Sequence, residues 1–89
     1  MSLKSPLKMS KEDEERFYAA MHLIKTELDW ATQTYGPFDS THEGYAIILE
    51  ELDELWDDIK EHKGDDGKEA IQVAAMAIRF IMDCCMREA

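Results

Sequence analysis

An all-α fold is predicted for this chain of 89 residues, on two observations. Three segments repeat apolar residues at steps of three and four, which is the period of a helix with one packed face. No segment alternates apolar and polar residues as a strand does, and breakers are few, with two Pro and four Gly. We therefore expect an antiparallel bundle of about three helices. Because so short a chain buries little apolar surface, we expect homo-oligomerisation to complete its core.

The first helix is predicted over residues 11–35, with Ser10 as its N-cap and acidic residues in its first turn. Gly36 and Pro37 end it. Residues 1–9 read as a flexible N-terminal tail, and residues 10–89 as a single helical domain. The apolar seam of this first helix comprises Phe17, Met21, Ile24, Leu28, Ala31 and Tyr35.

The second helix is predicted from Thr41 to about Lys63 and Gly64, with Ser40 as cap in a Ser-x-x-Glu capping box that ends at Glu43. Its core side is expected to contain Tyr45, Ile48, Leu49, Leu52, Leu55, Trp56 and Ile59. After a turn over residues 65–68, a third helix is predicted over residues 69–86. This helix is apolar almost all round, so we expect it to be central.

The composition excludes several classes of protein. Twenty acidic residues against ten basic ones give a formal net charge of −10, which disfavours binding to nucleic acid. The adjacent Cys84 and Cys85 fit neither a zinc site nor a secreted disulfide framework, which favours a cytoplasmic protein. The most apolar stretch, residues 70–82, contains Gln72 and Arg79, so no membrane span is expected. A homodimer or homotetramer is expected.

An acidic cluster is the strongest functional signal in the sequence. Glu50, Glu51 and Glu54 lie close together on the predicted second helix, where their mutual repulsion requires a positive partner. Glu69 and Gln72 lie one turn apart on the third helix and can face this cluster. Hard oxygen ligands of this kind favour Mg²⁺, with Mn²⁺ as the alternative cation.

These residues resemble a known family. Glu50-Glu51-x-x-Glu54, a gap of residues 55–68, and Glu69-x-x-Gln72 are similar to the EExxE…ExxD signature of the MazG-type nucleotide pyrophosphohydrolases. The resemblance runs from about Phe17 to Asp83 and includes a Trp followed by Gly at the end of the first helix. The signature departs at its last residue, where Gln72 replaces Asp. A neutral amide can still offer an oxygen, but it removes a negative charge and should weaken metal binding.

The resemblance implies an all-α pyrophosphatase fold and hydrolysis of a nucleoside triphosphate to a monophosphate and pyrophosphate. It also implies roles for residues of this chain, with Glu51, Glu54, Glu69 and Gln72 as metal ligands. Glu50 would hold a second metal or orient the attacking water. Lys68 and Arg79 would bind the phosphates, although Arg79 could instead pair with Asp83. Trp30 would form part of a base-binding wall, although a Trp near a helix end is commonly core or interface.

Two other interpretations remain open from the sequence. A run such as Glu-Glu-Leu-Asp-Glu is most often a solvated helix face, so the chain could be a small acidic interaction protein that mimics nucleic acid or docks on a basic partner. Alternatively, Gln72 could mark a relative that binds nucleotide or metal without turnover. Glu43 is interpreted as a capping residue only and is left out of the site.

Overall fold

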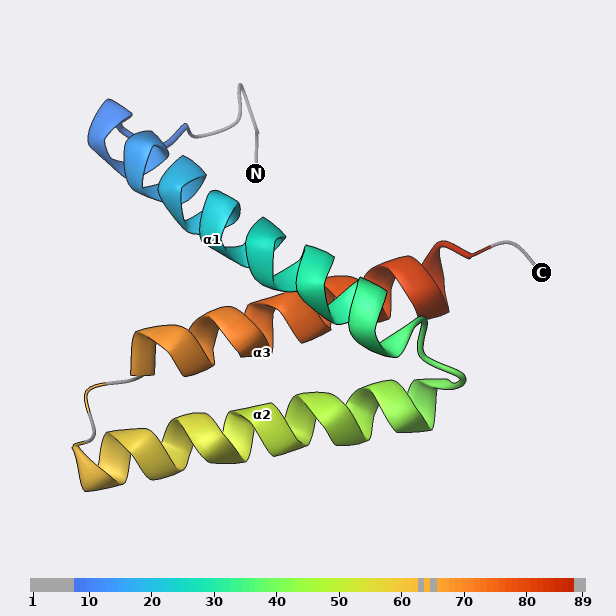
Figure 1. Ribbon diagram of the computed structural model, residues 1–89. Helices are drawn as coiled ribbons and strands as arrows, with labels where there is room; N and C mark the ends of the chain where they lie inside the picture. The colour runs from blue at the N-terminus through green and yellow to red at the C-terminus, as the bar shows by residue number, and fades with distance from the viewer. Residues whose placement is uncertain (1–7, 63, 65, 88–89) are drawn as a thin grey trace, which may run out of the picture.

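The computed structural model describes residues 8–62, 64 and 66–87, and the described residues are helical apart from short connections (Figure 1). Helix α1 spans Lys11–Tyr35, α2 spans Thr41–Glu61, and α3 spans Asp66–Phe80 and continues into a short π-helix, η1, at Ile81–Cys85. This confirms the predicted all-α class. Most of the predicted tail lies outside the described residues. Within the described ranges, no helix is both long enough and apolar enough to cross a membrane.

The predicted N-caps of α1 and α2 are confirmed. The Ser10 side chain accepts a hydrogen bond from the Asp13 backbone N–H at 3.1 Å, and the Ser40 side chain accepts one from the Glu43 N–H at the same distance. The Glu43 carboxylate accepts in turn from the Asp39 N–H at 2.7 Å. Side-chain oxygens thus bond backbone donors that have no partner within the helix, which fixes where both helices begin.

Both ends of α3 differ from the prediction. The helix begins at Asp66, three residues before the predicted start at Glu69. At its other end the α-helix stops at Phe80, where the sequence predicted continuation to Met86. The chain widens there into a π-turn, in which the Met86 N–H donates to the Ile81 carbonyl at 3.0 Å. Periodicity alone does not distinguish this turn from α-helix, because a single π-turn changes the spacing of side chains only slightly.

Helix α3 is central, as predicted, because α1 and α2 each pack against it. Helices α2 and α3 run antiparallel side by side, whereas α1 crosses α3 obliquely and its N-terminal half projects away from the other helices (Figure 1). The hydrophobic core lies at this crossing. Its buried side chains are Leu28, Ala31, Phe38, Ala75 and Met76.

Much of the predicted core is exposed instead. On α2, Ile48 packs against the core, but Leu52 is 48 % exposed and Trp56 is 56 % exposed. The reason is geometric, because among the described helices α2 packs mainly against α3, which covers one side of it. The predicted core positions that lie exposed are Phe17, Met21, Tyr35, Tyr45, Leu49, Leu52, Trp56 and Ile59.

The buried Gly44 allows α2 to approach the end of α3 closely. A Cβ atom at this position would lie 2.6 Å from Cδ2 of Phe80 and 3.2 Å from Cδ2 of Phe38. We expect Gly44→Ala to lower the free energy of unfolding by about 1–3 kcal/mol, since overpacking outweighs the helix propensity that Ala adds. Urea denaturation measures this. Gly67→Ala is the matched control, because nothing lies within 4 Å of its added Cβ, and it should leave stability unchanged or raise it.

Candidate functional site

Three glutamates from two helices converge at one point. Glu51 and Glu54 lie one turn apart on α2, and Glu69 lies near the start of the antiparallel α3. Each offers a carboxylate oxygen, and these oxygens all lie within 4.8 Å of one another. Because α2 and α3 are joined by a short connection, the last turns of α2 face the first turns of α3. The sequence spacing therefore predicted this meeting of side chains, and the structure shows it.

The carboxylates perturb one another. Burial raises the pKa of Glu51 to about 7, with further contributions from the negative charges of Glu54 and Glu69. Burial also raises the pKa of Glu69, followed by the charges of Glu54 and Asp58. In both groups burial raises the pKa most and the neighbouring negative charges raise it further, so each carboxyl favours its protonated form more than a free glutamate does. A proton or a cation offsets these negative charges.

Gln72 lies one turn after Glu69 on α3, and its amide reaches both helices. With its nitrogen turned toward the carboxylates, it donates to Glu69 Oε2 at 3.0 Å and to Glu51 Oε2 at 2.9 Å. With its oxygen at that position, it adds a fourth oxygen to the three carboxylates. The set then consists of hard oxygen donors only, which is the chemistry that Mg²⁺ and Mn²⁺ bind.

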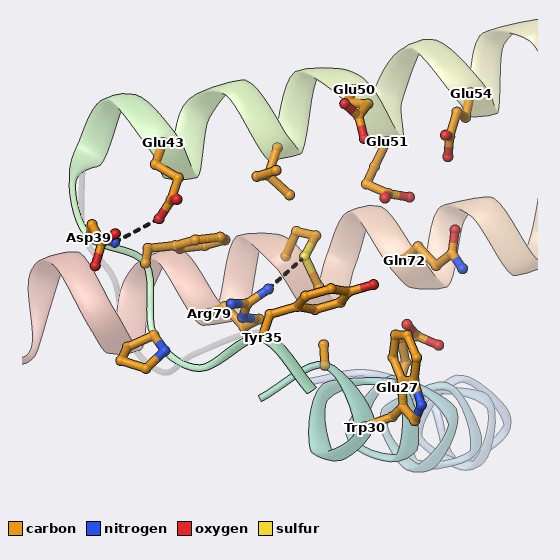
Figure 2. Close-up of a pocket in the computed structure, with 15 residues that line it drawn as sticks. Glu27, Trp30, Tyr35, Asp39, Glu43, Glu50, Glu51, Glu54, Gln72 and Arg79 are labelled. Atoms are coloured by element: carbon orange, nitrogen blue, oxygen red, sulfur yellow. Dashed lines mark hydrogen bonds between the residues drawn. The ribbon is translucent and has the colours of Figure 1, made fainter. Parts of the chain in front are cut away.

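The carboxylate cluster opens into a pocket of about 730 Å³ between the three helices. Figure 2 shows Glu50, Glu51 and Glu54 along α2, with Trp30 and Glu27 of α1 on the opposite side. Gln72 and Arg79 of α3 lie between them. The full lining is Glu27, Trp30, Ala31, Tyr35, Pro37, Phe38, Asp39, Glu43, Ile47, Glu50, Glu51, Glu54, Gln72, Met76 and Arg79.

Arg79 lies in the wall of this pocket and is only 3 % exposed. Its guanidinium donates to the Gly36 carbonyl at 2.6 Å and to Met76 Sδ at 3.3 Å, and its carbon Cζ lies 4.2 Å from the centre of the Phe38 ring. Its Nε–H has no hydrogen-bond partner among the described residues. Arg79 therefore anchors the connection between α1 and α2 to α3 and leaves one buried donor unused.

The alternative pairing of Arg79 with Asp83 is not formed among the described residues. Asp83 Oδ2 instead accepts a hydrogen bond from the Phe38 backbone N–H at 3.0 Å. Arg79 of α3 and Asp83 of η1, which lie one turn apart, thus each form a hydrogen bond with the backbone of the connection between α1 and α2, at Gly36 and at Phe38. This fixes the end of the pocket that lies away from the carboxylate cluster.

Of the other predicted site residues, some line the pocket and one lies outside it. Glu50 and Trp30 line the pocket, and the exposed Trp30 packs edge to face with Tyr35 at 5.6 Å between ring centres. Lys68 does not line it. Its side chain lies at a separate shallow hollow with His22 and other residues of α1. The phosphate-binding role that the resemblance implied for Lys68 therefore has no support from its position.

Several pocket residues were missed from the sequence. Glu27 is a half-buried carboxylate from α1 on the wall opposite Glu50, and its position just before the buried Leu28 was the available signal. Glu43 was interpreted as a cap only, yet it both caps α2 and lines the pocket. Asp39 lines it as well, from the connection between helices, where no periodicity reveals which way a side chain points.

Comparison with known proteins gives no match to a family model, to a curated protein or to a solved structure. The resemblance to the MazG-type pyrophosphohydrolases accordingly stays a prediction from the sequence.

Proposed function

We propose that this protein hydrolyses nucleoside triphosphates, with a divalent cation, to nucleoside monophosphates and pyrophosphate. The observation that carries the proposal is the convergence of Glu51, Glu54 and Glu69 beside a pocket of about 730 Å³, which Glu51 and Glu54 line. This volume lies within the range of small-molecule sites. The cluster and the pocket together support a ligand that is both polyanionic and too large for a metal site alone.

The cation follows from the charge of the substrate. A triphosphate carries about four negative charges and would be repelled by bare carboxylates. Mg²⁺, or Mn²⁺, held by Glu51, Glu54, Glu69 and the amide oxygen of Gln72, would neutralise the phosphates and draw electron density from them. Three carboxylates and an amide that can turn its oxygen toward them are a donor set that suits such an ion, which supports the proposal.

The reaction requires a positioned water. Its oxygen forms a bond to the α-phosphorus, the bond from that phosphorus to the bridging oxygen breaks, and pyrophosphate leaves with the bridging oxygen. Glu50 lines the pocket beside Glu51, and its carboxylate is suited to orient the water and accept its proton. On the opposite wall, the Glu27 carboxylate is a second acceptor for such a water (Figure 2).

The nucleoside has a distinct part of the pocket available. Trp30 and Tyr35 offer two exposed aromatic rings, and flat rings of this kind stack on nucleobases. Both rings belong to the last turns of α1, across the pocket from the carboxylates of α2. The pocket thus combines a wall suited to cation-bound phosphates with one suited to a base.

The test is to incubate the purified protein with each common ribo- and deoxyribonucleoside triphosphate, with and without Mg²⁺, and to measure pyrophosphate. Pyrophosphate that forms only with the cation supports the proposal. Binding of nucleotide and metal without product would indicate a relative that lacks turnover. Affinity for a basic partner that needs no cation and falls steeply with salt would indicate the acidic interaction protein.

We also expect the chain to self-associate through the exposed apolar side of α2, which includes Leu52 and Trp56. A second copy of the same surface would remove these side chains from water, and burial of each contributes about 1.5–3 kcal/mol. Leu52→Lys should shift the protein to monomer in light scattering after size exclusion. Asp53→Lys changes the neighbouring exposed residue and should not. A monomeric wild type would contradict this expectation.

A further inference from the structure

A row of large apolar side chains runs along one exposed side of α2. Its members follow one another at steps of four and three residues, which places them on one line of the helix. We call it the α2 row, and it consists of Tyr45, Leu49, Leu52, Trp56 and Ile59. These residues are between 40 % and 65 % exposed, so the described helices leave the row largely uncovered. Apolar side chains spaced in this way are typical of a helix that packs against another helix.

A row of smaller side chains runs along α3 and into η1, on the same side of the helix pair. We call it the α3 row, and it consists of Ala70, Ala74, Ala77 and Ile81. These residues again follow one another at steps of four and three. At about 100° per residue, the α3 row lies opposite the pocket residue Arg79, and the α2 row lies opposite the pocket residue Glu54. Both rows therefore lie on the face of the α2–α3 pair that is turned away from the pocket.

We propose that a second copy of this chain covers this face, and that the α2 row of each copy packs on the α3 row of the other. Self-association through α2 leaves open which helix of the second copy is its partner, and the sizes of the side chains decide this. Large side chains fill the spaces between alanines, so α2 on α3 gives the same close contact twice. If each row packed on its own copy, the large α2 rows would hold the two α3 helices apart and leave gaps between their alanines.

The heights of the residues along the helices agree with this pairing. Within the chain, Glu51 of α2 lies beside Gln72 of the antiparallel α3. A two-fold axis parallel to the helices keeps each residue of the second copy at the height of its counterpart. Leu52, the next residue after Glu51, then lies level with the space between Ala70 and Ala74 of the second copy. The two pockets face away from each other in this dimer, and each is formed within one copy.

The area and the charge of this face both suit a second copy. The α2 row and Ile81 together expose on the order of 600 Å² of apolar surface per copy. A standard interface buries about 800 Å² per partner, of which about two thirds is apolar in homodimers. Neither row contains a charged residue, although the chain has a formal net charge of −10. Two copies can therefore meet here without bringing acidic side chains together, whereas a basic partner would find no opposite charge in these rows.

The experiment is a rescue between two variants, measured by light scattering after size exclusion. Leu52→Lys and Ala70→Glu each place a charge in both copies of the contact, so each variant alone should be monomeric. An equimolar mixture should form a heterodimer. In that complex the introduced Lys faces the introduced Glu at one contact, and the other contact keeps its native residues. We expect the mixture to associate at least about tenfold more tightly than either variant alone. Circular dichroism verifies that each variant is folded.

The matched control is Gln33→Glu, which adds the same acidic group at an exposed position of α1. This variant should remain a dimer, and it should recruit Leu52→Lys no better than the wild type does. A second measurement leaves the interface intact and follows Trp56 in Trp30→Phe protein. Its fluorescence emission should move to shorter wavelength as rising protein concentration drives association, because the ring leaves water.

Three results would overturn the proposal. The first is a wild type that stays monomeric. The second is an Ala70→Glu variant that remains a dimer, or a mixture of folded monomeric variants that fails to associate. Either would mean that α2 packs on α2 or on the exposed N-terminal half of α1 in the second copy, if it packs on a copy at all. The third is Trp56 emission that does not change while the protein associates. None of these results bears on the release of pyrophosphate, so the proposed function is tested separately.

Discussion

Glu54→Gln is expected to abolish the release of pyrophosphate, lowering the rate by about a hundredfold or more. The Glu54 carboxylate interacts electrostatically with Glu51 on its own helix, α2, and with Glu69 on α3. It therefore links the carboxylates that the two helices bring to the cluster. Its replacement by an amide removes one charge from a site that must hold a divalent cation against a polyanion. The side chain is exposed and keeps its shape, so the helices should be unaffected.

The measurement is pyrophosphate formed from the best substrate in Mg²⁺, with circular dichroism to verify the helix content. Asp53→Asn is the matched control, since it removes the same charge from the adjacent exposed position, which does not line the pocket. It should retain wild-type activity. Full activity of Glu54→Gln would refute the assignment of the site, whereas loss of activity in both variants would show a general effect of charge.

The second large effect is a dependence of Mg²⁺ affinity on pH. The pKa of Glu51 is about 7, and its protonated form cannot serve as a ligand. Between pH 6 and pH 8 its ionised fraction rises about tenfold, so Mg²⁺ affinity should rise by a similar factor. Activity at limiting Mg²⁺ should follow the same curve. Calorimetric titration at several pH values measures the affinity directly.

Without the cation, the free energy of unfolding should fall as the pH rises, which is opposite to the change in Mg²⁺ affinity. The pKa of Glu51 is raised in the folded state above the ordinary value of 4.5, so folding favours its protonated form. This contribution is fully present below pH 4.5 and is lost as the pH rises through about 7. Thermal unfolding in EDTA should therefore show stability falling across this window, and Mg²⁺ should offset the loss. Glu51→Gln should remove most of this dependence, and an unchanged profile would contradict the role of Glu51.

The helices themselves could be predicted closely from the sequence. Their starts at Lys11 and Thr41 follow from Ser10 and Ser40, whose side chains bond donors within the next turn. Such interactions join residues three apart, so they are decided before distant segments meet. The π-turn after Phe80 was missed because nothing in the apolar spacing distinguishes it from α-helix.

Part of the site could also be predicted, because some of its residues lie close together along the chain. Glu51, Glu54 and Glu69 lie on two helices joined by a short connection, so their spacing along the chain already places them together. Glu27 is on α1, and its position opposite the cluster depends on how that helix crosses α3. The crossing results from packing among residues far apart in the sequence, which no local pattern encodes.

The sequence alone determined the helical class, the capped starts of α1 and α2, and the grouping of carboxylates on adjacent turns, because all of these are set by contacts within a few residues. Only the tertiary structure decided which apolar faces are covered, that Arg79 is buried in the pocket wall, and that Lys68 lies outside it. Both basic residues lie on α3, and they differ because the connection at Gly36 and Phe38 covers Arg79, whereas Lys68 lies beside His22 of α1 at a separate hollow. Long-range packing, rather than local spacing, selects which charged side chains reach the pocket.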